Sequence, residues 1–467
     1  MWQGPVVPPL SPVSPVGALP ASATGAPPLV VGAIELLNSF IPVFVVAFFA
    51  TLLMTPVVRR MAVAADVIDH PDQTRKLHAY PIAYLGGLAV FFGVLMGVAA
   101  SYVLVRGDAA ALVPLPISIV VGMVAIAFTG LADDIWKWDP RLKIAGQLVA
   151  AAALAVQDFG TRVAQGMLTP LMGDASTPIF HLSGNAAITN GDVYYWVGVA
   201  IVAFFVLGGC NAANLIDGLD GLLSGSVAIM AVGFLLISLL MGMLIPVTDT
   251  DNTLVAARVA LSLALLGAVL GFLPFNFNPA VIFLGDAGSL LLGYLCVTLI
   301  LMFGEHMQIP LVLAGLIIFS LPILDTMLAI IRRRLAGVSF STADSNHIHH
   351  QMKRAMGSVR KAVLALYGMT AMFTLLGVAL AAVRLLTNVR LLVIIAVTSV
   401  VFAFVAAVAI KTARMGAWTL AERRRADGAE PGQGQPAPAA AAPGSAEAPV
   451  TAASSARAAA ERRTPVL

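Results

Sequence analysis

Long apolar stretches, separated by short polar segments, dominate the chain. Each stretch is close to the roughly 20 residues that a helix needs to cross the hydrocarbon core of a bilayer. The pattern predicts an all-α, polytopic integral membrane protein with about eleven transmembrane helices. We expect these spans near residues 40–58, 83–105, 112–131, 142–159, 193–213, 222–245, 254–273, 287–304, 309–331, 362–384 and 391–410.

The stretch at 142–159 is the weakest of these predicted spans. It is rich in alanine and is interrupted by Gln147 and Gln157. We retain it because an even number of spans would place the later basic loops on the opposite side of the membrane from the earlier ones.

The two ends of the chain differ from the apolar centre. Residues 1–37 are rich in proline and begin with 33 residues that hold no Lys or Arg, so they lack the basic start of a signal peptide and predict a flexible extracytoplasmic tail. Residues 412–467 consist largely of Ala, Pro, Gly and Arg, a composition that cannot bury enough apolar area to offset chain entropy. We expect a disordered cytoplasmic tail there, and a transmembrane domain over 38–411.

Composition supports the membrane class. Hydrophobic residues make up 59% of the chain and charged residues 11%, which is about half of the usual charged share. These values exclude an ordinary soluble enzyme, a disordered protein and a disulfide scaffold. Cys210 and Cys296 both lie in apolar runs, which leaves no disulfide framework or zinc ribbon. The net charge of +3 is too nearly balanced to indicate a nucleic-acid partner.

The distribution of Lys and Arg predicts the orientation, because basic loops remain in the cytoplasm. With the N-terminus outside and the C-terminus in the cytoplasm, 22 of the 27 Lys and Arg residues lie on the inner side. The longest outer loop, 160–192, alternates apolar and polar residues and is compatible with a short hairpin. No internal repeat is visible, which weakens an inverted-repeat transporter hypothesis.

Clusters of polar residues gather on the predicted cytoplasmic side. Five loops carry them, namely 72–87 (DQTRKLHAYPIAYLGG), 130–143 (GLADDIWKWDPRLK), 211–221 (NAANLIDGLDG), 283–289 (FLGDAGS) and 332–350 (RRRLAGVSFSTADSNHIHH). Structural charge without a function would not segregate to one side in this way.

The 211–221 loop suits a hard cation. Asn211, Asn214, Asp217 and Asp220 offer oxygen ligands of the kind that Mg²⁺ prefers, usually together with water and substrate phosphates. The alternative is a capped helix end in which Asn214 and Asp217 bond backbone groups. We favour the cation site, because carboxylates close to a membrane interior tend to mark functional sites.

Three further carboxylates are less informative one by one. Asp133 and Asp134 repel each other unless a cation or a shared proton relieves them, yet an isolated pair is more often a solvated helix end. Asp286 and Ser289 mark the expected N-terminus of a helix, where free N–H groups favour anions. Simple N-capping by Asp286 explains that motif equally well.

The 332–350 loop joins basic residues to imidazoles. Zinc is disfavoured because no Cys accompanies the histidines, whereas Arg and His side chains suit a diphosphate. The candidate substrate-binding residues are Arg332, Arg333, His347, His349 and His350, with Arg75 and Lys76 from the first loop. The positive-inside rule alone would also explain the arginines. Asp325, about two turns inside the ninth span, either pairs with an Arg or shapes the site.

In this order and on one side, the motifs resemble those of the polyprenyl-phosphate N-acetylhexosamine-1-phosphate transferases of glycosyltransferase family 4. NAANLIDGLDG, FLGDAGS and HIHH carry the resemblance, which spans about residues 40–410. It implies transfer of a sugar 1-phosphate from a UDP-N-acetylhexosamine to undecaprenyl phosphate, with release of UMP. It also implies Mg²⁺ or Mn²⁺ as cofactor, and a multi-pass protein of the inner (cytoplasmic) membrane whose active site faces the cytoplasm.

The resemblance implies roles for individual residues. Asn214 and Asp286, with Asp217 beside them, would hold the metal, and Asp133 and Asp134 would position or deprotonate the lipid phosphate. Further residues complete the predicted site, with Asp220 grouped among the catalytic carboxylates, Lys143 and Asn211 among the substrate-binding residues, and the HIHH loop gripping the nucleotide sugar.

The HIHH form resembles the branch that uses GlcNAc-type donors for envelope polysaccharides. Ser345 stands where relatives often have Arg or Lys, and Ala83 replaces a frequent Pro. Three alternatives stay open: a phospho-MurNAc-pentapeptide transferase, a carboxylate-dependent secondary transporter, and an inactive scaffold. A homodimer also stays open.

Overall fold

The computed structural model describes residues 32–69, 81–105, 115–181, 187–245, 254–335, 347–387, 393–403, 407 and 411. Helices account for most of these residues, which confirms the all-α class. The first helix, α1 (Ala33–Ala64), begins inside the predicted N-terminal tail, so that boundary was placed too late. The remainder of both tails lies outside the described residues.

Eight helices of the described chain are long and apolar enough to cross a membrane. They are α1, α2 (Gly86–Val103), α3 (Ile117–Trp136), α6 (Asn190–Ile216), α7 (Leu222–Leu244), α8 (Val255–Asn276), α9 (Gly285–Met302) and α13 (Val359–Leu386). The protein is therefore a multi-pass membrane protein.

Two further candidates are bent pairs of helices. Helices α4 (Pro140–Ala155) and α5 (Phe159–Met172) meet at 74°, and α10 (Ile309–Ile318) and α11 (Ser320–Leu335) meet at 73°. Counting each pair as one span gives up to ten, and a shorter apolar helix, Val393–Ala403, occupies the eleventh predicted run. The number eleven and the orientation stay predictions.

The predicted span over 309–331 is bent, because the helix breaks next to Phe319. Pro322 explains the position of the break. A proline inside a helix has no N–H to donate to the carbonyl four residues earlier, and its ring clashes with that carbonyl, which here belongs to Ile318.

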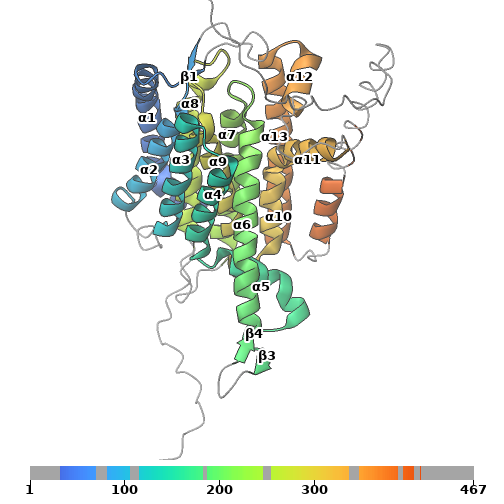
Figure 1. Ribbon diagram of the computed structural model, residues 1–467. Coiled ribbons are helices and arrows are strands. Elements are labelled where there is room, and N and C mark those ends of the chain that lie inside the picture. The colour runs from blue at the N-terminus through green and yellow to red at the C-terminus, as the bar shows by residue number, and fades with distance from the viewer. Residues whose placement is uncertain are drawn as a thin grey trace, which may run out of the picture. The chain divides into compact units, whose positions relative to one another are not determined.

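The predicted outer loop contains more structure than expected. Its hairpin is confirmed, as β3 (Pro178–His181) pairs antiparallel with β4 (Ala187–Thr189). The loop also contains α5, where the sequence indicated no helix. Sequence FGTRVAQGMLTPLM is short and amphipathic, so it does not produce the continuous apolar signal used to find spans. Figure 1 shows this hairpin at one end of the helices and α12 (Ile348–Met356) at the other.

Helix α9 forms the centre of the packing. Every residue of α9 is buried except Asp286, and α2, α3 and α6 all pack against it. Small residues permit the close approach: a Cβ on Gly87 would lie 2.1 Å from the backbone N of Gly288, and one on Gly130 would lie 2.4 Å from the Cα of Ala287. Small residues at such contacts are typical of membrane helices, whose association depends on close packing.

We therefore expect Gly87→Ala to force α2 and α9 apart and to destabilise the protein by about 1–3 kcal/mol, the usual effect of overpacking. The thermal unfolding midpoint of the detergent-solubilised protein would measure this. Gly208→Ala is the matched control, because a Cβ there meets nothing within 4 Å. Equal midpoints for the two variants would contradict the close packing at Gly87.

Candidate active site

The N-terminus of α9 is capped by a side chain from another helix. Near the end of α3, Asp134 accepts hydrogen bonds from the backbone N–H groups of Asp286 (2.8 Å) and Ala287 (3.0 Å). Helix N-termini leave such groups unsatisfied and attract negative charge. The expected helix start is confirmed, but its cap is Asp134 and not Asp286. Gly285, at φ +73°, allows Asp134 to approach this closely.

A lysine neutralises part of the charge at this helix end. Lys143, in the first turn of α4, forms ion pairs with Asp286 and, at 3.3 Å, with Asp133. Asn214, near the end of α6, donates to Asp286 Oδ1 (2.8 Å) and to Ser289 Oγ (2.9 Å). Side chains from α3, α4, α6 and α9 therefore meet around Asp286, and we call Asp133, Asp134, Asp217 and Asp286 the carboxylate cluster.

Asp217 directly follows α6, and its surroundings disfavour the charged form of its carboxylate. Burial, and after it the charges of neighbouring carboxylates, raise its pKa to about 8. Those carboxylates belong to Asp286, Asp134 and Asp220. Like charges held together in a poorly solvated place disfavour ionisation unless a cation joins them. A bound cation would therefore stabilise the ionised form of these carboxylates.

Two of the predicted metal ligands, Asn214 and Asp286, are in direct contact at this helix end. Within the described residues, no group of three or more His, Cys, Asp or Glu side chains could hold a metal ion. Asn214, Asp217 and Asp286 nevertheless fit Mg²⁺, because this ion is usually bound by one or two carboxylates and completes its shell with water and substrate phosphates. The raised pKa of Asp217 is consistent with such a cation.

Two predicted site residues have structural partners of their own. Asp220 accepts from Asn278 Nδ2 (2.8 Å) and the backbone N–H of Ala280 (3.1 Å), so it holds the turn that follows α8. Asn211 donates to Gln147 Oε1 at 2.8 Å and thereby ties α6 to α4. Gln147, fully buried in α4, was noted in the sequence only as an interruption of an apolar run.

The HIHH segment is attached to the helices by Asp325, whose role the sequence left open. Asp325 is fully buried in α11. Its carboxylate lies 3.0 Å from His347 Nδ1 and accepts the backbone N–H of Ile348 at 2.8 Å. His349 Nδ1 lies 3.8 Å from the same carboxylate. The partners of Asp325 are therefore His347 and the start of α12, with His349 close by, and in this way Asp325 shapes the site.

His349 connects this segment to the carboxylate cluster. A Cβ on Gly218 would lie 2.1 Å from His349 Nε2, so the imidazole packs directly on the backbone next to Asp217. Burial lowers the pKa of His349 to about 3, which keeps the ring neutral. Because His347 and His349 are buried, His350 is the most accessible of the three. Burial and nearby positive charge also lower the pKa of His350.

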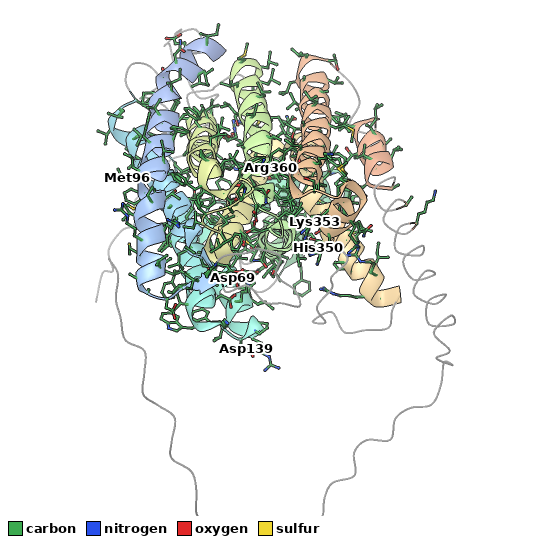
Figure 2. The ribbon with its side chains drawn as sticks, turned by 90° about the horizontal axis from the view of Figure 1, so that it is seen from above. Asp69, Met96, Asp139, His350, Lys353 and Arg360 are labelled. Carbon is green, nitrogen blue, oxygen red and sulfur yellow. The ribbon has the colours of Figure 1, made fainter. Side chains whose placement is uncertain are left out.

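The predicted convergence of loops is confirmed for the parts that the structure describes. Figure 2, the view from above, labels Asp69 of β1 (Ile68–Asp69) and His350 of α12. Arg332 lies close enough to His349 for its charge to lower the pKa of that ring. Arg333 follows Arg332 in the last turn of α11. Arg75 and Lys76 lie outside the described residues.

Comparison with known proteins agrees with this geometry. The family model "Glycosyl transferase family 4" matches residues 116–304. A probable undecaprenyl-phosphate N-acetylglucosaminyl 1-phosphate transferase of Bacillus subtilis (strain 168) is 32% identical over 326 residues, which are 69% of this chain and 80% of that protein. The chain belongs to glycosyl transferase family 4.

Two other similar relatives differ from each other in the reaction that their names describe. A decaprenyl-phosphate N-acetylglucosaminephosphotransferase of Mycolicibacterium smegmatis is 32% identical over 340 residues, 69% of this chain and 77% of that protein. A phospho-N-acetylmuramoyl-pentapeptide-transferase of Desulforudis audaxviator is 34% identical over 272 residues, 54% of this chain and 74% of that protein. The second match thus covers a smaller part of the chain.

Replacing Asp325 tests whether it anchors the HIHH segment. We expect Asp325→Ala to speed amide exchange over α12 by roughly tenfold or more, because hydrogen bonds to a charged group contribute about 1.5–3 kcal/mol. Hydrogen–deuterium exchange with mass spectrometry would measure this, with the exposed Glu35→Ala in α1 as control. Unchanged exchange at α12 would show that the anchor lies elsewhere.

Proposed function

We propose that this protein transfers N-acetylglucosamine 1-phosphate from UDP-GlcNAc to undecaprenyl phosphate, with release of UMP. It would perform this reaction at the cytoplasmic face of the inner membrane, as the first membrane step of an envelope polysaccharide. The observation that carries the proposal is the meeting of Lys143, Asn214 and Asp286 at the N-terminus of α9, with His349 packed against Gly218 beside them.

The reaction requires several negative charges to approach one another. An oxygen of the lipid phosphate attacks the phosphorus bound to the sugar, a new diphosphate linkage forms, and the bond to UMP breaks. Lys143 offsets part of this charge, and a positioned cation stabilises charge that develops in the transition state. Bound Mg²⁺ or Mn²⁺ would supply further neutralisation of the donor diphosphate.

The carboxylates take different parts in this scheme. Both oxygens of Asp134 accept backbone N–H groups, so its task is to hold the start of α9. Asp133 retains 20% exposure of its side chain and contacts Lys143, which places it better to orient or deprotonate the lipid phosphate. Asn214, Asp217 and Asp286 would bind the metal.

We base the choice of donor on the relatives that match the larger part of this chain. The proteins named for N-acetylglucosamine match 69% of this chain, against 54% for the phospho-MurNAc-pentapeptide transferase. That second enzyme would share the carboxylate cluster and differ at the donor-binding loop. A secondary transporter receives less support, because the carboxylates of the cluster lie at helix ends rather than at the middle of spans.

Purified full-length protein should release UMP from UDP-GlcNAc only when undecaprenyl phosphate and Mg²⁺ are both present, and chelation by EDTA should stop release. Detection of UMP by chromatography measures the reaction. Release from UDP-MurNAc-pentapeptide alone would change the assigned donor. If no UDP-sugar led to UMP release with either undecaprenyl or decaprenyl phosphate, the transferase proposal would be rejected.

Removing the charge of Asp286 should reduce kcat by about a hundredfold or more. Loss of a single group that stabilises charge in a transition state usually has an effect of this size. Asp286→Asn should also weaken Mn²⁺ binding measured by electron paramagnetic resonance. Asp158→Asn is the matched control, because Asp158 is exposed next to α5. Near-normal turnover of Asp286→Asn at saturating Mg²⁺ would remove Asp286 from the metal site.

A further inference from the structure

Tyr84 lies beside the carboxylate cluster and has no role in the chemistry described so far. It occupies the turn between β2 (Ile82–Ala83) and α2, where Leu85 adopts a left-handed conformation with φ 78°. Its ring meets Phe283 edge to face, with centroids 5.7 Å apart and planes at 69°. Phe283 belongs to the FLGD motif, three residues before Asp286.

Backbone hydrogen bonds hold this aromatic pair in place. Phe283 donates its N–H to Ala83 O (2.8 Å), and Gly86 donates its N–H to Phe283 O (2.9 Å). Tyr84 donates its own N–H to Val67 O at 3.1 Å. The chain on both sides of Tyr84 is thus bonded to the segment that starts α9, so the side chain has a defined position relative to Asp286.

The hydroxyl of Tyr84 differs from the other tyrosine hydroxyls of the described chain. Tyr102, Tyr194, Tyr294 and Tyr367 each donate to a backbone carbonyl. Tyr195 is exposed and meets Trp196 edge to face. Tyr84 is partly buried, yet its hydroxyl makes no hydrogen bond to another described residue. Buried polar groups usually have a hydrogen-bond partner. Because the Tyr84 hydroxyl has none among the described residues, it is available as a donor to a ligand.

The surroundings identify the ligand chemistry. Burial first, and then the charges of four carboxylates, raise the pKa of Tyr84 above its usual value. They belong to Asp69, Asp134, Asp217 and Asp286. The phenol therefore stays protonated, as a neutral donor beside a negatively charged cluster. A protonated phenol can donate to an anionic acceptor without adding a further negative charge, and a phosphate oxygen, which Lys143 would help to attract, is such an acceptor.

We infer that Tyr84 is a phosphate-binding residue whose hydroxyl donates a hydrogen bond to a phosphate oxygen of a substrate bound at the N-terminus of α9. This inference rests on the proposed transferase function. The oxygen belongs either to the diphosphate of the UDP-sugar or to the phosphate of the lipid, since both must reach the same cluster. Separate titration of the two substrates distinguishes these sources.

Tyr84→Phe removes the hydroxyl and keeps the ring on Phe283. In full-length protein in nanodiscs, we expect kcat/KM to fall about tenfold or more for the substrate that Tyr84 contacts, since a hydrogen bond to a charged group is lost. An increase in KM for UDP-GlcNAc assigns the diphosphate, and an increase in KM for undecaprenyl phosphate assigns the lipid. Tyr195→Phe, which removes an exposed hydroxyl, should stay within about twofold of the unaltered protein.

Two further measurements distinguish the effect of the Tyr84 hydroxyl from that of its ring, and failure of this inference from failure of the proposed function. Tyr84→Leu should lose about as much as Tyr84→Phe; a loss confined to Tyr84→Leu would overturn the inference, because the ring and not the hydroxyl would then matter. Kinetics of Tyr84→Phe equal to those of the active, unaltered protein would overturn it as well. An unaltered protein that releases no UMP with any donor would instead reject the proposed function.

Discussion

A helix whose N-terminus is buried must find acceptors for its first N–H groups inside the protein, and Asp134 supplies them to α9. This interaction determines where the neighbouring groups lie. It brings the end of α3 against the start of α9, so that Lys143 reaches Asp286. It also leaves Asp286 as the residue of α9 that is not buried. The proposed chemistry is thus located where a structural requirement for negative charge already exists.

Burial, and after it the carboxylates gathered around that cap, raise the pKa of Asp217, so ionising this group has an electrostatic cost. Lys143 is paired with two of these carboxylates, so the cluster retains unbalanced negative charge. A divalent cation with a diphosphate donor would balance it, and this explains why an anionic cluster can serve a reaction between anions. The position at helix ends lets a membrane lipid and a soluble nucleotide meet at one surface.

A second buried carboxylate organises the other half of the site. Asp325 bonds His347 and the first amide of α12, and this arrangement sets His349 on Gly218. His347 and His349 are therefore buried within this arrangement, while the side chain of His350 is only partly buried. The bend between α10 and α11, which Pro322 causes, is what brings Asp325 to this position.

The sequence by itself determined the membrane class, most helix positions and the set of polar motifs, because apolar runs and clustered carboxylates are properties of consecutive residues. It missed α5, whose amphipathic pattern is short, and the break at Phe319. The role of Asp325, the cap by Asp134 and the position of Tyr84 against Phe283 depend on residues far along the chain; Asp134 and Asp286 are 152 residues apart. Only the tertiary structure decides such pairs, since many carboxylates have the chemistry to cap a helix and packing alone selects the one that reaches it.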